Sequence, residues 1–384
     1  METEQVVMEL KFAEPNKRDN TNYLTHNFHS YPCKFIPQIP RSTILELTKK
    51  TDVVLDPFCG CGTTLIEAKL LGRDAIGVDL NPIATLISRA KTTKLSSTKV
   101  DGTFELLDMI KGDIENYYNK KLDLNDNDIP KFKNIAHWFQ PNVVTELAII
   151  KSHINKLKDG KLKDYLYTAF SSIIVNVSNQ ESDTRFAAID KKIANWKTFE
   201  EYSRKINDMN KRILEFDNTA SDSNIKVYQA DSQNLDFIAD NTIDHVVTSP
   251  PYANTYDYYL YHKFRIWWLD YELQELQEKE IGSRNRHSSK KEDISTFEKG
   301  LQRCFDEISR VLKPNKIVTV VIGDSVIRGE LIRANEVLKE IALNSNLRPI
   351  REIKNKLSES SRMFNPKFTN KDKLEYIMFF KNLK

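Results

Sequence analysis

The stretch that most restricts the fold runs from Thr51 to Ala84 and reads TDVVLDPFCGCGTTLIEAKLLGRDAIGVDLNPIA. Its segment VVLDPF predicts a buried strand, a glycine-containing loop follows, and residues 64–71 have the pattern of a helix. DAIGVDL predicts a second strand, and PIATLISRA predicts the start of a second helix. Short connections between strand, helix and strand are typical of a doubly wound parallel sheet, so we expect an α/β protein.

The periodicity then changes and later changes back. Residues 98–223 carry helical patterns, such as PNVVTELAIIKSHINKLKD, and no convincing strand. Strand patterns return with IKVYQAD, IDHVVTSPPY, KIVTVVIGD, RPIREI and LEYIMFF. The chain thus predicts a Rossmann-like, doubly wound sheet of seven mostly parallel strands with a helical insertion. The predicted divisions are a flexible N-terminal segment (1–25), the cofactor-binding half of the sheet domain (26–97), the helical insertion (98–223) and the catalytic half of the sheet domain (224–384).

Composition excludes some classes of protein and leaves others open. The 384 residues are 40% hydrophobic and 29% charged, with no apolar run long enough to span a membrane and no signal-peptide pattern. The net charge of +3, from 57 basic and 54 acidic residues, permits a nucleic-acid partner without arguing for one. The four cysteines have neither metal-ligand nor disulfide-framework spacing, so we expect the reducing cytoplasm.

The glycine turn after the first predicted strand, DPFCGCGT, is a candidate ligand site. Gly60 and Gly62 lack β-carbons, so a ligand can lie against the backbone beside the start of a helix. Asp79 ends the next strand, 19 residues beyond Gly60, where a carboxylate can accept hydrogen bonds from both ribose hydroxyls. Asp56 stands where a dinucleotide would place phosphate, so we expect a nucleoside with an ammonium group, such as S-adenosylmethionine. A tight turn with two capping carboxylates is the alternative.

Another acid, Asp231, follows the predicted strand IKVYQA. At the mouth of a third parallel strand, its carboxylate could accept a hydrogen bond from an adenine amino group. The alternative is a helix N-cap at DSQNL.

The segment TSPPY, residues 248–252, ends a further predicted strand with two prolines that can donate no ladder hydrogen bond. An exocyclic amino group of a nucleobase is a poor nucleophile, because its lone pair is delocalised into the ring. Ser249 Oγ and the Pro250 carbonyl, held by the adjacent prolines, are acceptors that would favour the more tetrahedral nitrogen of a methyl-transfer transition state. Tyr252 offers a flat face on which an extruded base can stack.

With DPFCGCGT and TSPPY at these positions, the chain resembles S-adenosylmethionine-dependent amino-methyltransferases that act on DNA. The TSPPY form is the one most associated with cytosine-N4 methylation, whereas adenine-N6 enzymes more often have Asp at the position of Ser249. The upstream segment HNFHSYPCKFIPQIPR resembles the family segment that folds over the methionine end of the cofactor. The residues and the resemblance together imply a catalytic site at Ser249, Pro250, Pro251 and Tyr252, and a cofactor site at Phe35, Ile36, Pro37, Asp56, Phe58, Gly60, Gly62, Thr63, Asp79, Leu80, Asp231 and Ser232.

A metal site at His26, His29 and Cys33 is an alternative interpretation of the upstream segment. It has no fourth ligand within range, so we expect no metal.

The segment that reads DNA sequence is left open by this pattern. Only 17 residues separate Asp231 from Thr248, too few for a recognition domain, so the insertion is the candidate. Tyr256 and Tyr258 are candidates for contact with nucleic acid, while the aromatic residues that follow predict the buried face of a helix on the sheet. Residues 178–192 predict a polar connector. The loop KEIGSRNRHSSKK would neutralise phosphates or is a solvated surface loop, and its basic candidates are Arg284, Arg286, Lys290 and Lys291.

The leading hypothesis is a methyltransferase that moves a methyl group from S-adenosylmethionine to cytosine N4 of a base flipped out of double-stranded DNA. It would serve a restriction-modification or related defence system in a bacterial or archaeal cytoplasm, with or without a partner restriction endonuclease. The alternatives are an adenine-N6 DNA methyltransferase, an RNA base methyltransferase of the same fold, and a non-catalytic nucleic-acid adaptor. The intact set of Asp56, Asp79 and Ser249 disfavours the adaptor.

Overall fold

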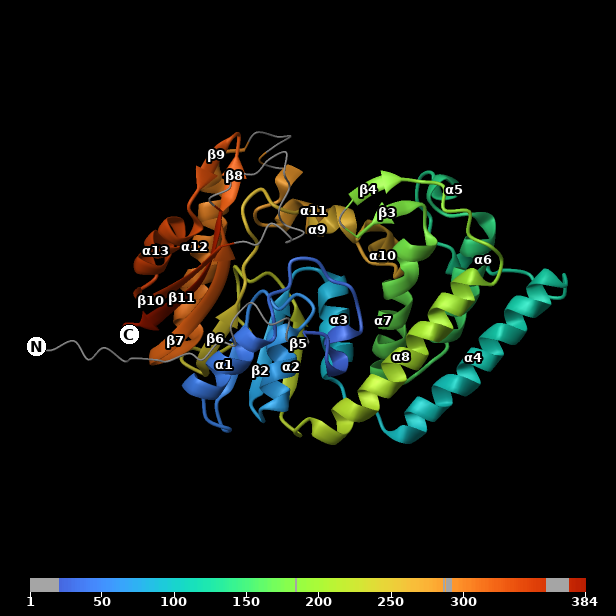
Figure 1. Ribbon diagram of the computed structural model, residues 1–384, viewed down its shortest axis with the longest axis horizontal. Helices are drawn as coiled ribbons and strands as arrows, with labels where there is room; N and C mark the ends of the chain where they lie inside the picture. The colour runs from blue at the N-terminus through green and yellow to red at the C-terminus, as the bar shows by residue number, and fades with distance from the viewer. Residues whose placement is uncertain (1–20, 184, 286, 288–291, 357–372) are drawn as a thin grey trace, which may run out of the picture.

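The computed structural model describes residues 21–183, 185–285, 287, 292–356 and 373–384 (Figure 1). Three of the predicted phosphate-binding residues, Arg286, Lys290 and Lys291, lie outside the described residues, as does most of the expected N-terminal segment 1–25. Within the described part of the chain, no helix combines the length and the apolar character needed to cross a membrane.

A single seven-stranded sheet organises one side of the molecule. Its order is β10-β11-β7-β6-β1-β2-β5. The five strands β7, β6, β1, β2 and β5 pair in parallel, whereas β11 runs antiparallel to both β7 and β10. The predicted doubly wound sheet and all seven strand candidates are therefore confirmed. The strand bounds are β1 (Val53–Asp56), β2 (Asp74–Asp79), β5 (Ile225–Gln229), β6 (Ile243–Thr248), β7 (Leu312–Gly323), β10 (Leu347–Lys356) and β11 (Leu374–Asn382).

Helices cover both faces of this sheet, because the central strands are apolar on both sides. In β1, Val54 packs in one cluster with Leu65, whereas its neighbour Leu55 packs in another with Leu301. Chain order reverses between β1 and β6, and in such folds ligands bind where the carboxyl ends of these strands meet. The covering helices are α1 (Gln38–Leu47) and α2 (Thr63–Leu70) on the first face, α12 (Ile294–Val311) and α13 (Ala334–Asn344) on the other, and α3 (Pro82–Thr92) beside β2 and β5.

The predicted insertion forms a helical body beside the sheet (Figure 1). Its long helices bury a continuous apolar core that also takes in Phe28 from the N-terminal segment. Helix α7 packs along α3 and α8 packs along η1, so the insertion rests on the first half of the sheet domain. The elements are η1 (Leu24–Asn27), followed after α3 by α4 (Ser97–Tyr118), η2 (Asp126–Asp128), α5 (Ile135–Trp138), α6 (Pro141–Asn155), α7 (Gly160–Val177) and α8 (Lys197–Thr219).

Within the insertion, the prediction of no strand and of a polar connector at 178–192 is wrong. Strands β3 (Gln180–Ser182) and β4 (Arg185–Ala188) pair antiparallel as a short hairpin. Its turn is held from outside, because Asp183 forms an ion pair with the buried Arg265. Such a long-range contact leaves no local pattern in the sequence. A second short hairpin, β8 (Ser325–Ile327) with β9 (Glu330–Ile332), follows β7 and was likewise not predicted.

The aromatic segment after TSPPY does not pack on the sheet as predicted. It forms the short helices α9 (Tyr258–Tyr261) and α10 (Lys263–Trp268), followed by α11 (Gln274–Lys279). Phe264 and Trp268 enter the core of the insertion, and α10 contacts α7 and α3. The aromatic pattern correctly indicated burial, but the burying surface comes from the insertion for Phe264 and Trp268, and from α3 and its surroundings for Tyr259 and Ile266.

Candidate active site

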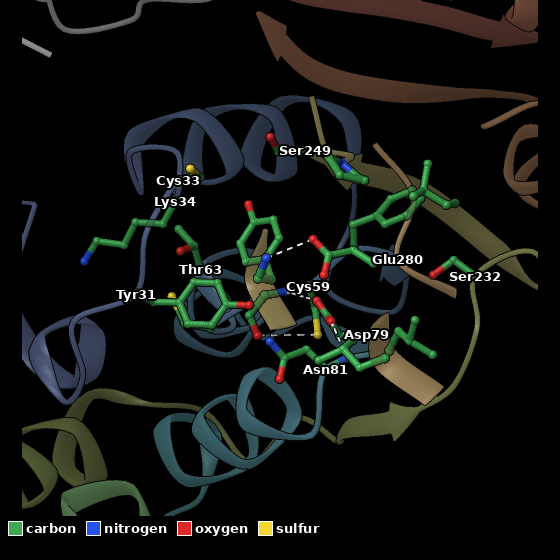
Figure 2. A pocket seen from close by; sticks show the side chains of 18 of the residues that line it. Tyr31, Cys33, Lys34, Cys59, Thr63, Asp79, Asn81, Ser232, Ser249 and Glu280 are labelled. Atoms are coloured by element: carbon green, nitrogen blue, oxygen red, sulfur yellow. Dashed lines mark hydrogen bonds between the residues drawn. The ribbon is translucent and has the colours of Figure 1, made fainter. Parts of the chain in front are cut away.

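A cavity lies at the carboxyl edge of the sheet, between the glycine turn after β1 and the proline segment after β6 (Figure 2). It brings together residues that are more than 200 positions apart in the sequence, from Tyr31 to Ile281. The predicted residues that line it are Phe35, Phe58, Gly60, Thr63, Asp79, Leu80, Asp231, Ser232, Ser249, Pro251 and Tyr258. The lining residues that the sequence did not indicate are Tyr31, Cys33, Lys34, Cys59, Cys61, Asn81, Leu276, Lys279, Glu280 and Ile281.

The glycine turn fixes the position of Asp79. Gly60 N–H donates to Oδ2 of Asp79 at 2.8 Å, and Asn81 N–H donates to Oδ1 at 2.8 Å. Burial raises the pKa of the Asp79 carboxyl to about 6. Each oxygen still has a lone pair for a ligand, so the carboxyl is oriented at the wall of the cavity.

Gly62 does not line the cavity. Its role is in the conformation of the turn. Its φ of 84° is left-handed, and a β-carbon there would lie 2.8 Å from Ser88 Oγ. Any other residue would therefore displace α3 from the turn.

Asp56 ends β1 behind the cavity and is not one of its lining residues. Thr248 Oγ1 donates to Oδ1 of Asp56 at 2.7 Å, and Phe58 N–H donates to the same oxygen at 3.2 Å. Burial raises the pKa of the Asp56 carboxyl to about 6. Because Thr248 directly precedes Ser249, this hydrogen bond joins the two motifs. The expected contact between Asp56 and an ammonium group therefore has no support from the lining of the cavity.

The proline segment contributes Ser249 and Pro251 to the lining, with Pro250 buried between them. Tyr252 is not a lining residue. Its ring lies over Gly323, where a β-carbon would come within 2.9 Å of the ring, and its hydroxyl donates to Glu375 Oε1 at 3.3 Å. The ring is thus held rigidly beside the cavity, on the second half of the sheet domain.

The upstream segment reaches the cavity mainly through residues other than the predicted ones. Of Phe35, Ile36 and Pro37, only Phe35 lines it, and the Ile36 side chain is 47% exposed. Tyr31 lies deeper, stacked on His262 with ring centroids 5.0 Å apart. The short spacing between Tyr31 and the predicted Phe35 was the one available signal.

Asp231 and Ser232 line the cavity from the loop after β5. Asp231 Oδ1 accepts a hydrogen bond from Gln233 N–H at 3.0 Å, and Ser232 Oγ donates to the Pro57 carbonyl. Residues 231–235 form a turn and no helix, so the alternative of a helix N-cap is wrong.

Glu280 is the most unusual of the unpredicted residues. It is 6% exposed, and its two oxygens accept hydrogen bonds from the backbone N–H groups of Tyr258 at 2.8 Å and Tyr259 at 3.0 Å. Burial raises the pKa of this carboxyl to about 8. It sits in a stretch that otherwise reads as a charged surface segment, so no sequence signal separated it from its exposed neighbours.

The candidates for nucleic-acid contact are separated by the fold. Tyr258 lines the cavity, whereas Tyr256 stacks on Tyr261 and its hydroxyl donates to the Asp183 carbonyl of the β3–β4 turn at 2.6 Å. Tyr256 therefore connects the insertion to the cavity wall. Arg284 is exposed.

The residues considered for a metal site have protein partners. His26 Nε2 lies 2.8 Å from Glu67 Oε1, and His29 Nε2 lies 3.0 Å from Ser171 Oγ. Among the residues that the structure describes, no group of three His, Cys, Asp or Glu side chains could hold a metal ion.

The chain matches a protein family described as DNA methylase, of the N6/N4 type, over residues 5–89 and 243–384. The matched residues include both motifs that form the cavity and leave out the insertion.

Among known proteins, the chain is 30% identical to the type II methyltransferase M.MvaI of Kocuria varians over 276 residues, which cover 67% of this chain and 60% of M.MvaI. It is 24% identical to the type II methyltransferase M.MjaII of Methanocaldococcus jannaschii, over 93% of this chain and 81% of that protein. The chain thus spans less than two thirds of M.MvaI. A solved geranyl diphosphate C-methyltransferase from Streptomyces coelicolor A3(2) aligns with 90% of this chain and 77% of its own at 7% identity, with a TM-score of 0.37 that is too low to support an argument.

Proposed function

Because this chain belongs to the N6/N4 DNA methylase family, we propose that it transfers a methyl group from S-adenosylmethionine to an exocyclic amino group of a DNA base, with cytosine N4 as the favoured position. One observation carries the proposal. The Asp79 carboxyl of the glycine-turn motif and the Ser249 side chain of the proline motif line the same cavity (Figure 2).

The residues around the cavity fit the proposed cofactor chemically. Asp79 is an oriented carboxyl suited to ribose hydroxyls, Asp231 is an acceptor suited to an adenine amino group, and Phe58 adds an apolar surface for the base. When bound, S-adenosylmethionine supplies an electrophilic methyl group.

The protein's own contribution to the reaction is positioning and hydrogen bonding. Ser249 Oγ and the Pro250 carbonyl would accept hydrogen bonds from the target amino group, which favours the tetrahedral nitrogen that attacks the methyl carbon. The prolines restrict the backbone that presents these two acceptors. Tyr252, held by Gly323 and Glu375, is the proposed stacking surface for the flipped base.

The proposed substrate is double-stranded DNA, and cytosine N4 is preferred because residue 249 is Ser. The proposed setting is a restriction-modification or related defence system, because the relatives named above are type II methyltransferases. Residues 98–223 are the proposed recognition region, because no other segment between the two motifs is long enough to form one.

The experiment that tests this proposal is incubation with isotope-labelled S-adenosylmethionine and mixed DNA and RNA, followed by mass spectrometry of the nucleosides. We expect labelled N4-methylcytosine in DNA and none with Ser249→Ala. Labelled N6-methyladenine would keep the enzyme class and correct the base, whereas label confined to RNA would overturn the DNA substrate. Absence of label with every substrate, together with no binding of the cofactor, would overturn the function.

A further inference from the structure

One wall of the cavity carries a carboxyl that the proposed function does not use. Glu280 follows α11 (Gln274–Lys279) and precedes Gly282, whose φ of 74° turns the chain back toward Tyr252. Its side chain is 94% buried and yet lines the cavity. The backbone N–H groups of Tyr258 and Tyr259 hold one oxygen each, so the carboxyl is fixed in place.

Lys34 and Lys279 line the same cavity, but neither forms a described ion pair with Glu280, and Lys279 pairs with Glu275 instead. The nearby charges that act on it are those of Asp257 and Asp79, both negative. None of the described residues forms an ion pair with it, since its described partners are the two backbone N–H groups. A buried acid in this position either stays neutral or meets a cation that comes from outside the protein.

The position of Glu280 shows which part of a ligand it would meet. Figure 2 draws its carboxyl between the labelled side chains of Ser249 and Asp79. Asp79 is the proposed ribose ligand and Ser249 the proposed ligand of the methyl acceptor. In S-adenosylmethionine the sulfonium sulfur is bonded to the 5′ carbon of the ribose, and the methyl group must point from it toward the acceptor. The sulfonium charge therefore belongs between these two residues, whereas the ammonium group lies three carbons further from the sulfur.

We propose that Glu280 makes this cavity selective for the charge of its nucleoside ligand, so that it binds the sulfonium donor S-adenosylmethionine in preference to the neutral thioether product S-adenosylhomocysteine. The inference rests on the proposed function. The two ligands share the adenosine, ammonium and carboxylate groups and differ only in the methyl group and one positive charge. A carboxylate beside the sulfur attracts the donor and loses that attraction once the methyl group has left, which favours release of the product.

The proposed selectivity is coupled to the protonation of Glu280. Because burial raises the pKa of Glu280 to about 8, the free protein holds it mostly protonated at pH 7, and a bound cation would lower that pKa again. Binding of the donor thus releases a proton from Glu280, and binding of the product does not. The other ionisable groups that line the cavity or lie against Glu280 are Tyr31, Cys33, Lys34, Cys59, Cys61, Asp79, Asp231, Asp257, Tyr258, Tyr259 and Lys279. Both ligands present the same ribose to Asp79 and the same adenine to Asp231. The difference in proton release between the two ligands therefore reports on Glu280.

The first test needs only the unmodified chain. Isothermal titration calorimetry at pH 7, in buffers with different ionisation enthalpies, measures the protons released with each ligand. We expect close to one more proton with S-adenosylmethionine than with S-adenosylhomocysteine. Sinefungin, in which a protonated amine replaces the sulfonium, should behave like the donor. Equal proton release with donor and product would overturn the inference.

The second test uses Glu280→Gln with the matched control Glu278→Gln, an exposed residue of the same segment that does not line the cavity. We expect Glu280→Gln to lower affinity for S-adenosylmethionine about tenfold and to change affinity for S-adenosylhomocysteine less than about twofold. The control should match the unmodified chain. Equal weakening of both ligands would show that Glu280 only supports the backbone of Tyr258 and Tyr259, and no change in either would remove it from the site.

The same titrations separate failure of the inference from failure of the proposed function. If the unmodified chain binds neither ligand, the proposed function itself is wrong. If it binds both and Glu280→Gln leaves their affinity ratio unchanged, only the role of Glu280 is wrong.

Discussion

Two buried glutamates, Glu146 in the insertion and Glu280 at the cavity, differ in how their carboxyl oxygens are used. Glu146 of α6 is fully buried and accepts three hydrogen bonds, from Tyr118 Oη at 2.8 Å, Trp196 N–H at 2.6 Å and Phe199 N–H at 3.0 Å. These donors tie α4 and the start of α8 to α6. From the described part of the chain, Glu280 accepts two hydrogen bonds, and it faces a cavity.

The difference teaches that burial alone does not identify a functional acid. A carboxyl whose acceptors are used by surrounding elements is part of the scaffold. One that faces a cavity beside like charges raises the free energy of the unliganded protein and is available to a ligand. The following predictions test whether the two regions divide in this way between stability and activity.

The largest expected effect is on the reaction, from the cavity side. Ser249→Ala should lower methyl transfer by about 10³-fold, because it removes an acceptor that acts in the transition state. Affinity for S-adenosylmethionine and the melting temperature should stay near those of the unmodified chain. The matched control is Ser172→Ala in α7, whose hydroxyl bonds only to its own helix, at the Ala169 carbonyl. A loss of activity in the control as large as that of Ser249→Ala would contradict the assignment of activity to the cavity and of stability to the insertion.

The next effect is on stability, from the insertion side. Glu146→Ala should lower the free energy of unfolding by about 3 kcal/mol, because it leaves three buried donors without an acceptor. Urea unfolding followed by circular dichroism measures this loss. Ligand affinity, measured well below the melting temperature, should remain within about twofold. A Glu146→Ala variant of normal stability would mean that the three hydrogen bonds do not hold the helices together.

Glu280→Gln should have the opposite sign of effect on stability, and the effect should grow from acid to alkaline pH. Between pH 4.5, the ordinary pKa of Glu, and about pH 8, the folded chain keeps a proton that the unfolded chain has lost. Stability therefore falls as the pH rises through this window, and the cost is complete above pH 8. We expect the ligand-free variant to be more stable by about 2 kcal/mol at pH 9 and unchanged at pH 4. A difference that is independent of pH would contradict a raised pKa at Glu280.

The smallest expected effect is on affinity. Asp79→Ala should weaken binding of S-adenosylmethionine and S-adenosylhomocysteine alike, by about tenfold, because the two share the ribose. Its matched control is Asp108→Ala, an exposed residue of α4. If the variant weakened the binding of one ligand only, Asp79 would lie near the sulfur and not near the ribose. It would then have the role proposed for Glu280.

The sheet could be predicted from the sequence because its strands are buried on both faces and separated by short, regular connections. The same holds for Gly60, Asp79 and Ser249, which stand at the ends of those strands, where the topology alone brings them to one edge.

The remaining site residues arrive through packing, which a local pattern does not encode. Tyr31 reaches the cavity by stacking on His262, and Glu280 reaches it through a turn at Gly282. The β3–β4 hairpin depends on Arg265, which is 82 residues from its partner Asp183. Asp56 and Tyr252 belong to the two motifs by sequence, yet neither lines the cavity. Asp56 accepts a hydrogen bond from Thr248, and Tyr252 donates one to Glu375.

The helical body between the motifs has a consequence for engineering. Its core contains Phe264 and Trp268 from beyond the proline segment and Phe28 from before the first strand, and Tyr256 is bonded to its hairpin. Residues 98–223 therefore cannot be transferred alone from one enzyme to another with their core intact. A chimera that exchanges this helical body would have to carry residues 24–31 and 256–268 along with it, as one transplanted unit.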